Sequence, residues 1–67
     1  MRDYQFYVTD DRYDVPSLMF VTVRDPCRAH RIAERILHEP HHHAVEVWER
    51  ERQLFTLSEA ARQGAEP

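Results

Sequence analysis

DPCRAHRIAERILHEPHHHAVEVW, residues 25–48, contains one amphipathic helix, a histidine-rich break and the start of the most strand-like run of the chain. Asp25 is a favourable N-cap residue, and Pro26 falls at the first helical position, where its missing N–H costs nothing. Pro40 cannot continue the helix. Apolar residues recur on one side with the helical period, namely Ala29, Ile32, Ala33, Ile36 and Leu37. The sequence therefore predicts a helix over residues 26–38 with one face to bury.

Four other stretches have the composition of β-strands. Residues 4–9 and 44–49 alternate between apolar and polar positions, residues 17–23 are apolar on both faces, and residues 53–57 follow a short charged turn. The order is therefore β-β-α-β-β. Both flanking pairs read as hairpins, and the crossover through the helix should place the third strand parallel to the second. We predict an α+β fold, with a four-stranded, mostly antiparallel sheet in the order 2-1-3-4 and the helix packed on one face.

The length of 67 residues predicts one domain, over residues 1–57. Residues 58–67 read as a flexible or frayed tail, either one helical turn capped by Ser58 or a disordered segment. A chain this short buries only about 60% of its unfolded surface. Cys27 is the only cysteine, so no disulfide can form within the chain. Small domains without disulfides are often stabilised by a partner, and we therefore expect oligomerisation.

One helix can cover only one face of the sheet. On the other face the strand pattern places Tyr7, Trp48 and one set of alternate residues of the second strand, either Leu18 and Phe20 or Met19 and Val21. That is more exposed apolar surface than a monomer usually carries. The interface that we predict consists of Tyr7, Leu18, Phe20 and Trp48.

Charge and hydropathy argue against several classes of protein. The net charge of −3 argues against a general nucleic-acid or membrane-surface binder, although protonation of all five histidines would bring it to +2. The N-terminus has no apolar segment typical of a signal peptide, and no run is long enough to span a membrane. All nine basic residues are arginine, which is typical of a GC-rich coding bias. We expect a cytoplasmic bacterial protein.

Histidines form the first candidate site. His41, His42 and His43 are consecutive, and His30, Glu34 and His38 share one stripe of the predicted helix. Imidazole is a common ligand of zinc and nickel, so His38, His41, His42 and His43 form a candidate metal site or pH sensor. The alternative is a solvated loop beside a helix surface with a Glu34–His38 pair, because no four-ligand motif is present.

An arginine ridge and the single cysteine are two further candidate sites. A ridge of Arg24, Arg28, Arg31 and Arg35, beside exposed aromatic residues, suggests an RNA-binding module, but no RNP-like signature is present and a solvated helix face is the alternative. Cys27 lies near the helix N-terminus between two arginines, which favours a reactive thiolate. The alternative is a small side chain tucked under the sheet, because no base or resolving cysteine accompanies it.

Three segments also resemble a known family. YQFYVTDD (residues 4–11), DPCRAHRIAERIL (residues 25–37) and HHHAVEVWERERQLFTL (residues 41–57) resemble a family of small uncharacterised proteins from alphaproteobacteria and their relatives. The resemblance covers residues 3–57, and its most specific part is AVEVWE followed by a charged turn. That family commonly has a glycine in this turn, where this chain has Arg50, so a tight hairpin would need a non-glycine residue at positive φ. The resemblance implies a fold and a lineage but no activity.

Taken together, the residues predict a non-enzymatic module without a cofactor that acts through protein–protein contact. The expected partner is a second copy of the chain on the helix-free sheet face, or else an unidentified protein on the same face. The alternatives from other classes are the histidine-based sensor of metal or pH and the RNA-binding module. No Gly-rich phosphate loop or nucleophile–base pair indicates an enzyme.

Overall fold

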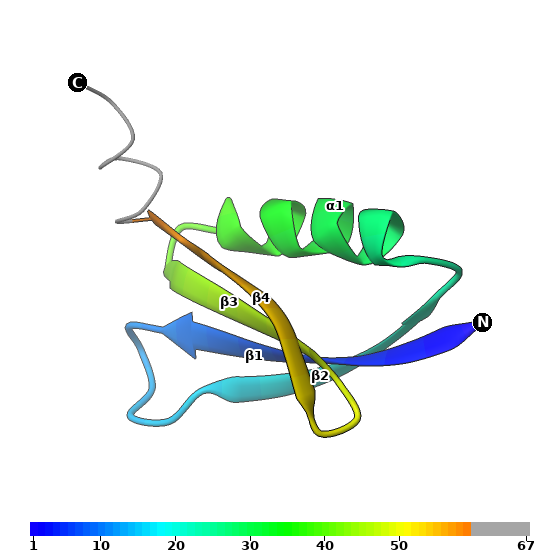
Figure 1. The fold of residues 1–67 in the computed structure, drawn as a ribbon. Helices are drawn as coiled ribbons and strands as arrows, with labels where there is room; N and C mark the ends of the chain where they lie inside the picture. The colour runs from blue at the N-terminus through cyan, green and yellow to red at the C-terminus, as the bar shows by residue number, and fades with distance from the viewer. Residues whose placement is uncertain (60–67) are drawn as a thin grey trace.

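A computed structural model of the chain describes residues 1–59. Its elements are β1 (Arg2–Asp10), β2 (Ser17–Val23), α1 (Pro26–Leu37), β3 (His42–Glu49) and β4 (Arg52–Ser58). They form one four-stranded sheet in the order β2-β1-β3-β4, in which all neighbouring strands are antiparallel. β2 and β3 both run antiparallel to β1 and are therefore parallel to each other. Figure 1 shows α1 lying across one side of this sheet. The predicted fold, the strand order and the parallel direction of β2 and β3 are confirmed.

The ends of α1 follow from its local sequence. The Asp25 carboxylate accepts a hydrogen bond of 2.9 Å from the Arg28 backbone N–H, and Pro26 starts the helix. His38 is the C-cap, and its N–H donates to the carbonyl groups of Glu34 and Arg35. The helix therefore ends one residue earlier than predicted.

The core lies between α1 and the covering face of the sheet. Tyr4, Phe6, Val8, Val45 and Val47 are each at most 1% exposed, and they pack against the buried face of α1, formed by Ala29, Ala33 and Leu37. Two alanines one turn apart let the helix backbone approach the sheet closely. The predicted apolar stripe is confirmed, with Ile32 and Ile36 partly buried at its margins.

β1, β3 and β4 are longer than the sequence pattern predicted, whereas β2 has the predicted bounds. β3 begins at His42, which pairs with Asp10 after a register shift between Thr9 and Asp10, so His42 and His43 belong to a strand and not to a solvated loop. β4 includes Ser58, which pairs with Ala44. The predicted tail after Ser58, either a capped helical turn or a disordered segment, falls mainly on residues 60–67, which lie outside the described residues.

The β3–β4 connection is the tight turn that the sequence predicted. Glu49 pairs with Arg52, which leaves Arg50 and Glu51 as the two turn residues. Arg50 has a φ of 59°, in the left-handed region that favours glycine. The expected non-glycine residue at positive φ is therefore confirmed. Within residues 1–59 no helix is long and apolar enough to cross a membrane.

Candidate functional site

The face of the sheet opposite α1, called here the helix-free face, carries two rows of side chains. Directly opposed residues of neighbouring strands point to the same side. One row consists of Leu18, Tyr7, Glu46 and Thr56, and the next consists of Phe20, Gln5, Trp48 and Gln53. All four predicted interface residues therefore lie on one face. The choice that the sequence left open in β2 falls on Leu18 and Phe20, because Met19 is opposite the buried Phe6 on the side of α1.

Apolar exposure on this face is concentrated on β2. The Phe20 side chain is 73% exposed and Leu18 is 46% exposed. Their neighbours on the inner strands, Tyr7 and Trp48, are half-buried. A large aromatic side chain that is mostly exposed is unusual in so small a domain, because its burial would contribute about 2 kcal/mol.

The two inner aromatic residues support each other. The rings of Tyr7 and Trp48 meet edge to face with centroids 6.3 Å apart and an interplanar angle of 78°. Trp48 Nε1 donates a 3.1 Å hydrogen bond to Glu46 Oε1, so its polar atom is satisfied within the face. Together with Gln5 and Pro16 they line a shallow hollow of about 430 Å³. Trp48 thus lies on the predicted face, but it is a half-buried part of the surface and not its most exposed point.

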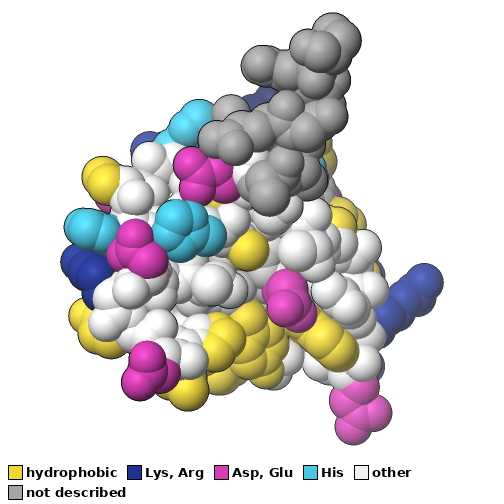
Figure 2. All heavy atoms as spheres, turned by 90° about the vertical axis from the view of Figure 1, so that its left-hand side faces the viewer, with side chains coloured by type: hydrophobic (Ala, Val, Ile, Leu, Met, Phe, Trp, Pro, Cys, Tyr) yellow, Lys and Arg dark blue, Asp and Glu magenta, His cyan; other side chains and the backbone are white. Residues whose placement is uncertain are grey.

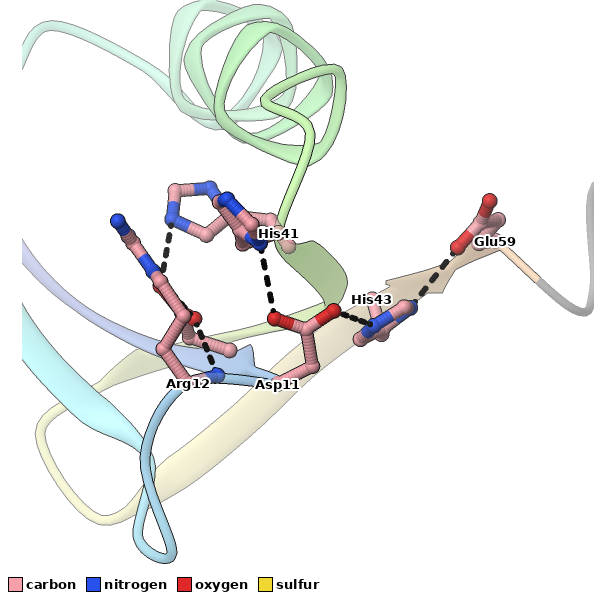
Figure 3. Close-up of polar contacts among 7 residues, drawn as sticks. Asp11, Arg12, His41, His43 and Glu59 are labelled. Carbon is pink, nitrogen blue, oxygen red and sulfur yellow. Dashed lines mark hydrogen bonds and ion pairs between the residues drawn. The ribbon is translucent and has the colours of Figure 1, made fainter.

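The histidine-rich segment forms a second cluster, called here the histidine clasp and defined as Asp11, His41, His43 and Glu59. The Asp11 carboxylate accepts from both imidazoles, at 3.0 Å from His41 Nδ1 and 3.2 Å from His43 Nε2. His43 Nδ1 lies 2.9 Å from Glu59 Oε2 on its other side. Figure 3 shows these contacts joining the β1–β2 turn, the start of β3 and the end of β4. In Figure 2 the histidine and acidic side chains gather at this end of the molecule.

His43 has a carboxylate at each ring nitrogen. An imidazole donates from both nitrogens only when it is protonated. Hydrogen bonds to Glu59 and then to Asp11 therefore raise the pKa of His43. In return, hydrogen bonds from His43 and His41 lower the pKa of Asp11. The clasp is complete only when both partners are charged.

An ion pair between the buried Asp10 and the exposed Arg12 lies beside the clasp. Asp10 is 3% exposed, and its carboxylate accepts from Arg12 Nε at 3.0 Å and Arg12 Nη2 at 2.7 Å. This bidentate pair lowers the pKa of Asp10 well below its usual range. The His42 ring bridges the Ile36 carbonyl, 2.7 Å from Nδ1, and Asp10 Oδ2, 3.4 Å from Nε2. The acidic β1–β2 turn is thus fixed to the connection between α1 and β3.

The clasp differs from the predicted metal site. Among residues 1–59, no three histidine, cysteine, aspartate or glutamate side chains are grouped so that they could hold a metal ion. His38 has no side-chain hydrogen bond or ion pair in this part of the chain and does not join His41, His42 and His43. The helix-surface pair is also different from the one expected, because His30 Nδ1 lies 2.8 Å from Glu34 Oε1 while its ring packs 5.0 Å from that of Phe55.

The predicted arginine ridge and Cys27 lie apart from the aromatic residues of the helix-free face and from the histidine clasp. The arginines of the predicted ridge, Arg24, Arg28, Arg31 and Arg35, are all exposed. Three of them lie on α1, on the opposite side of the sheet from Tyr7, Phe20 and Trp48. The expected combination of arginines with exposed aromatic residues is therefore not brought together on one surface. Cys27 is exposed, so the alternative of a thiol tucked under the sheet is wrong.

Sequence reasoning missed two members of the clasp. Asp11 directly follows the first strand, and the predicted pairing of that strand with the third one was the signal that could have placed its carboxylate near the histidines. Glu59 follows the predicted last strand, and no local pattern connects it with His43. A search for matches among protein-family models, curated proteins and solved structures finds none for this chain.

Proposed function

We propose that this chain is a small interaction module of the bacterial cytoplasm, without enzymatic activity, that acts as a homodimer. The contact between the copies involves the helix-free face. The observation that supports this most directly is the 73% exposure of Phe20, next to Leu18 at 46%, on a face that no described element covers. The lineage suggested by the resemblance to alphaproteobacterial proteins is part of the same proposal.

Self-association would remove this surface from water. Phe20 lies beside Gln5, and Leu18 lies beside Tyr7, so a second copy would extend an apolar surface that already has the Tyr7–Trp48 pair at its centre. Burial of an exposed phenylalanine contributes about 2 kcal/mol, which corresponds to roughly a 30-fold change in a dissociation constant. A contact of this kind also supplies the stabilisation that a short chain lacks.

The test compares two exposed aromatic residues. Phe20→Ser should raise the dimer dissociation constant by roughly 30-fold or more, because each dimer loses the residue twice. Tyr13→Ser is the matched control, since Tyr13 is 60% exposed but lies in the β1–β2 connection and not on the helix-free face. Sedimentation equilibrium measures the constant, and far-UV circular dichroism checks that both variants fold. Equal constants for the two variants would contradict the proposal.

A second candidate function is a pH sensor built on the histidine clasp. The position of His43 between two carboxylates favours it, because protonation completes the clasp and deprotonation opens it. The measurement is an NMR titration of wild-type chain and of Asp11→Asn. Amide signals of both the β1–β2 turn and β4 should shift with the His43 ring in wild-type chain. Shifts confined to His43 itself would contradict a sensor.

A further inference from the structure

β2 is an open edge of the sheet. It pairs only with β1, and its other side has no hydrogen-bonded neighbour among residues 1–59. Natural edge strands are usually protected from pairing by charges, proline, a bulge or a short length. β2 has seven residues, SLMFVTV, with no charge and no proline, and its register with β1 has no shift. The other edge, β4, starts with Arg52 and has a register shift opposite Val47 and Trp48.

The exposed apolar residues of β2 point to both sides of the sheet. Leu18 and Phe20 lie on the helix-free face, whereas Met19, on the side of α1, is also 41% exposed. Stacking two helix-free faces would cover Leu18 and Phe20 but would leave Met19 in water. A strand added at the β2 edge would supply neighbours to all three.

We propose that two copies of the chain pair through their β2 strands, antiparallel and centred on Phe20, so that the two sheets become one continuous sheet. This rests on the proposed self-association and specifies its geometry. With Phe20 opposite its own symmetry mate, every residue from Ser17 to Val23 has a partner. Met19 is then opposite Val21 of the second copy on the side of the helices. The two Phe20 rings meet on the helix-free face, where aromatic cross-strand pairs are favourable.

Charge at the ends of β2 is complementary in this arrangement. The connection before β2 contains Asp14, and Arg24 follows β2 directly; both are exposed, and neither has an ion-pair partner among residues 1–59. Antiparallel pairing brings Asp14 of one copy toward Arg24 of the other, twice per dimer, while the neighbouring Asp25 carboxylate is engaged as the N-cap of α1. No charged residue lies within the paired segment itself, so no like charges are opposed.

Hydrogen exchange of the unmodified chain tests the edge directly. In an antiparallel pair, alternate residues of a strand direct their N–H groups to one neighbour, so every second amide of β2 points away from β1. Edge pairing should protect all amides of β2 under conditions where the chain is dimeric. A face-to-face dimer leaves every second amide of β2 unprotected. This alternating pattern in a dimer would overturn edge pairing while leaving the proposed self-association intact, whereas a monomeric chain would overturn both.

Charge reversal gives an independent test that leaves the core untouched. Arg24→Asp and Asp14→Arg should each raise the dimer dissociation constant by about five-fold, and the double variant should restore it. Because both residues are exposed, neither change should alter folding, which circular dichroism checks. Arg31→Asp on the outer side of α1 is the matched control and should leave the constant unchanged. A double variant as weak as the single variants would overturn this geometry.

Discussion

Tyr4 shows how one residue limits the stability of this domain. Its side chain is fully buried in the core, and its hydroxyl has no hydrogen-bond partner among the described residues. Burial also raises the pKa of Tyr4, since the ionised form would be worse placed there. An unsatisfied buried hydroxyl costs about 1–3 kcal/mol. The ring therefore stabilises the core while its polar atom opposes folding.

Replacing this hydroxyl should stabilise the chain. Tyr4→Phe is expected to increase the free energy of unfolding by about 1 kcal/mol, which for a domain of this size raises the melting temperature by about 4–8 °C. Tyr13→Phe is the control, because Tyr13 is exposed and its hydroxyl is solvated. Thermal unfolding followed by circular dichroism measures both. A lower melting temperature for Tyr4→Phe would mean that the hydroxyl does have a partner.

For single residues, the sequence predicted which face of the sheet a side chain lies on better than it predicted which residues that side chain contacts. Strand alternation placed Trp48 and Tyr7 on the helix-free face correctly, because period 2 depends only on the local chain. It could not show that the two rings pack together or that Phe20 is the most exposed, since this depends on which strands are neighbours and which is the edge. Phe55, which packs against the His30 ring, and the two carboxylates that contact His43 belong to other elements and were missed for the same reason.

Among the elements, the β3–β4 turn holds Arg50 in a backbone conformation that non-glycine residues disfavour. Arg50 has a φ of 59°, which costs a non-glycine residue about 1 kcal/mol. Arg50→Gly should therefore increase the free energy of unfolding by up to about 1 kcal/mol. Glu51→Gly, at the neighbouring turn position without positive φ, should give no gain. Urea unfolding of the two variants checks this, and a destabilised Arg50→Gly would indicate that the arginine side chain makes a compensating contact.

The histidine clasp connects elements and makes stability depend on pH. The folded-state pKa of His43 is raised above its usual value of about 6.5, so its contribution is fully present below that pH and is lost as the pH rises through the folded-state pKa. The pKa of Asp11 is lowered from about 3.9, so its contribution is present above that pH and is lost as the pH falls through the folded-state pKa. The clasp therefore contributes most between about pH 4 and pH 6.5.

A variant separates this contribution from the rest of the pH dependence. His43→Gln should lower the melting temperature more at about pH 5.5 than at about pH 8.5, because the stabilisation from protonated His43 is lost as the pH rises through its raised folded-state pKa. His38→Gln, which removes a histidine outside the clasp, should show no such difference. Differential scanning calorimetry at both pH values measures it. A loss that is equal at the two pH values would contradict the assigned role of His43.

Local signals were sufficient to predict the elements themselves. The Asp25 cap, the apolar stripe and Pro40 placed α1 within one residue, and hairpin pairing with a single crossover gave the strand order. The beginning of β3 and the end of β4 were missed, because His42, His43 and Ser58 have no strong strand propensity. They are in strands because Asp10 and Ala44 lie opposite them. Tertiary pairing overrode local preference there.

Over the whole molecule, one layer of helix is too small for the sheet it covers. α1 buries the centre of one face, but the exposed apolar residues Leu18, Met19 and Phe20 remain on the β2 edge. Composition predicted this surplus, since a chain of 67 residues with one helix and four strands has one face left over. Only the structure shows that these exposed apolar residues lie on an unprotected edge strand. The result is a domain whose stability and association are expected to be coupled.

Self-association of the wild-type chain can be tested by its absolute mass in solution. Size-exclusion chromatography with multi-angle light scattering, at micromolar concentration and without added metal, should give a mass near twice the 8.1 kDa of one chain. Dilution should lower this mass progressively, because the contact is built from a short edge and its neighbouring side chains. A mass of 8.1 kDa at every concentration would contradict the account, and the exposed β2 residues would then have to serve a different protein.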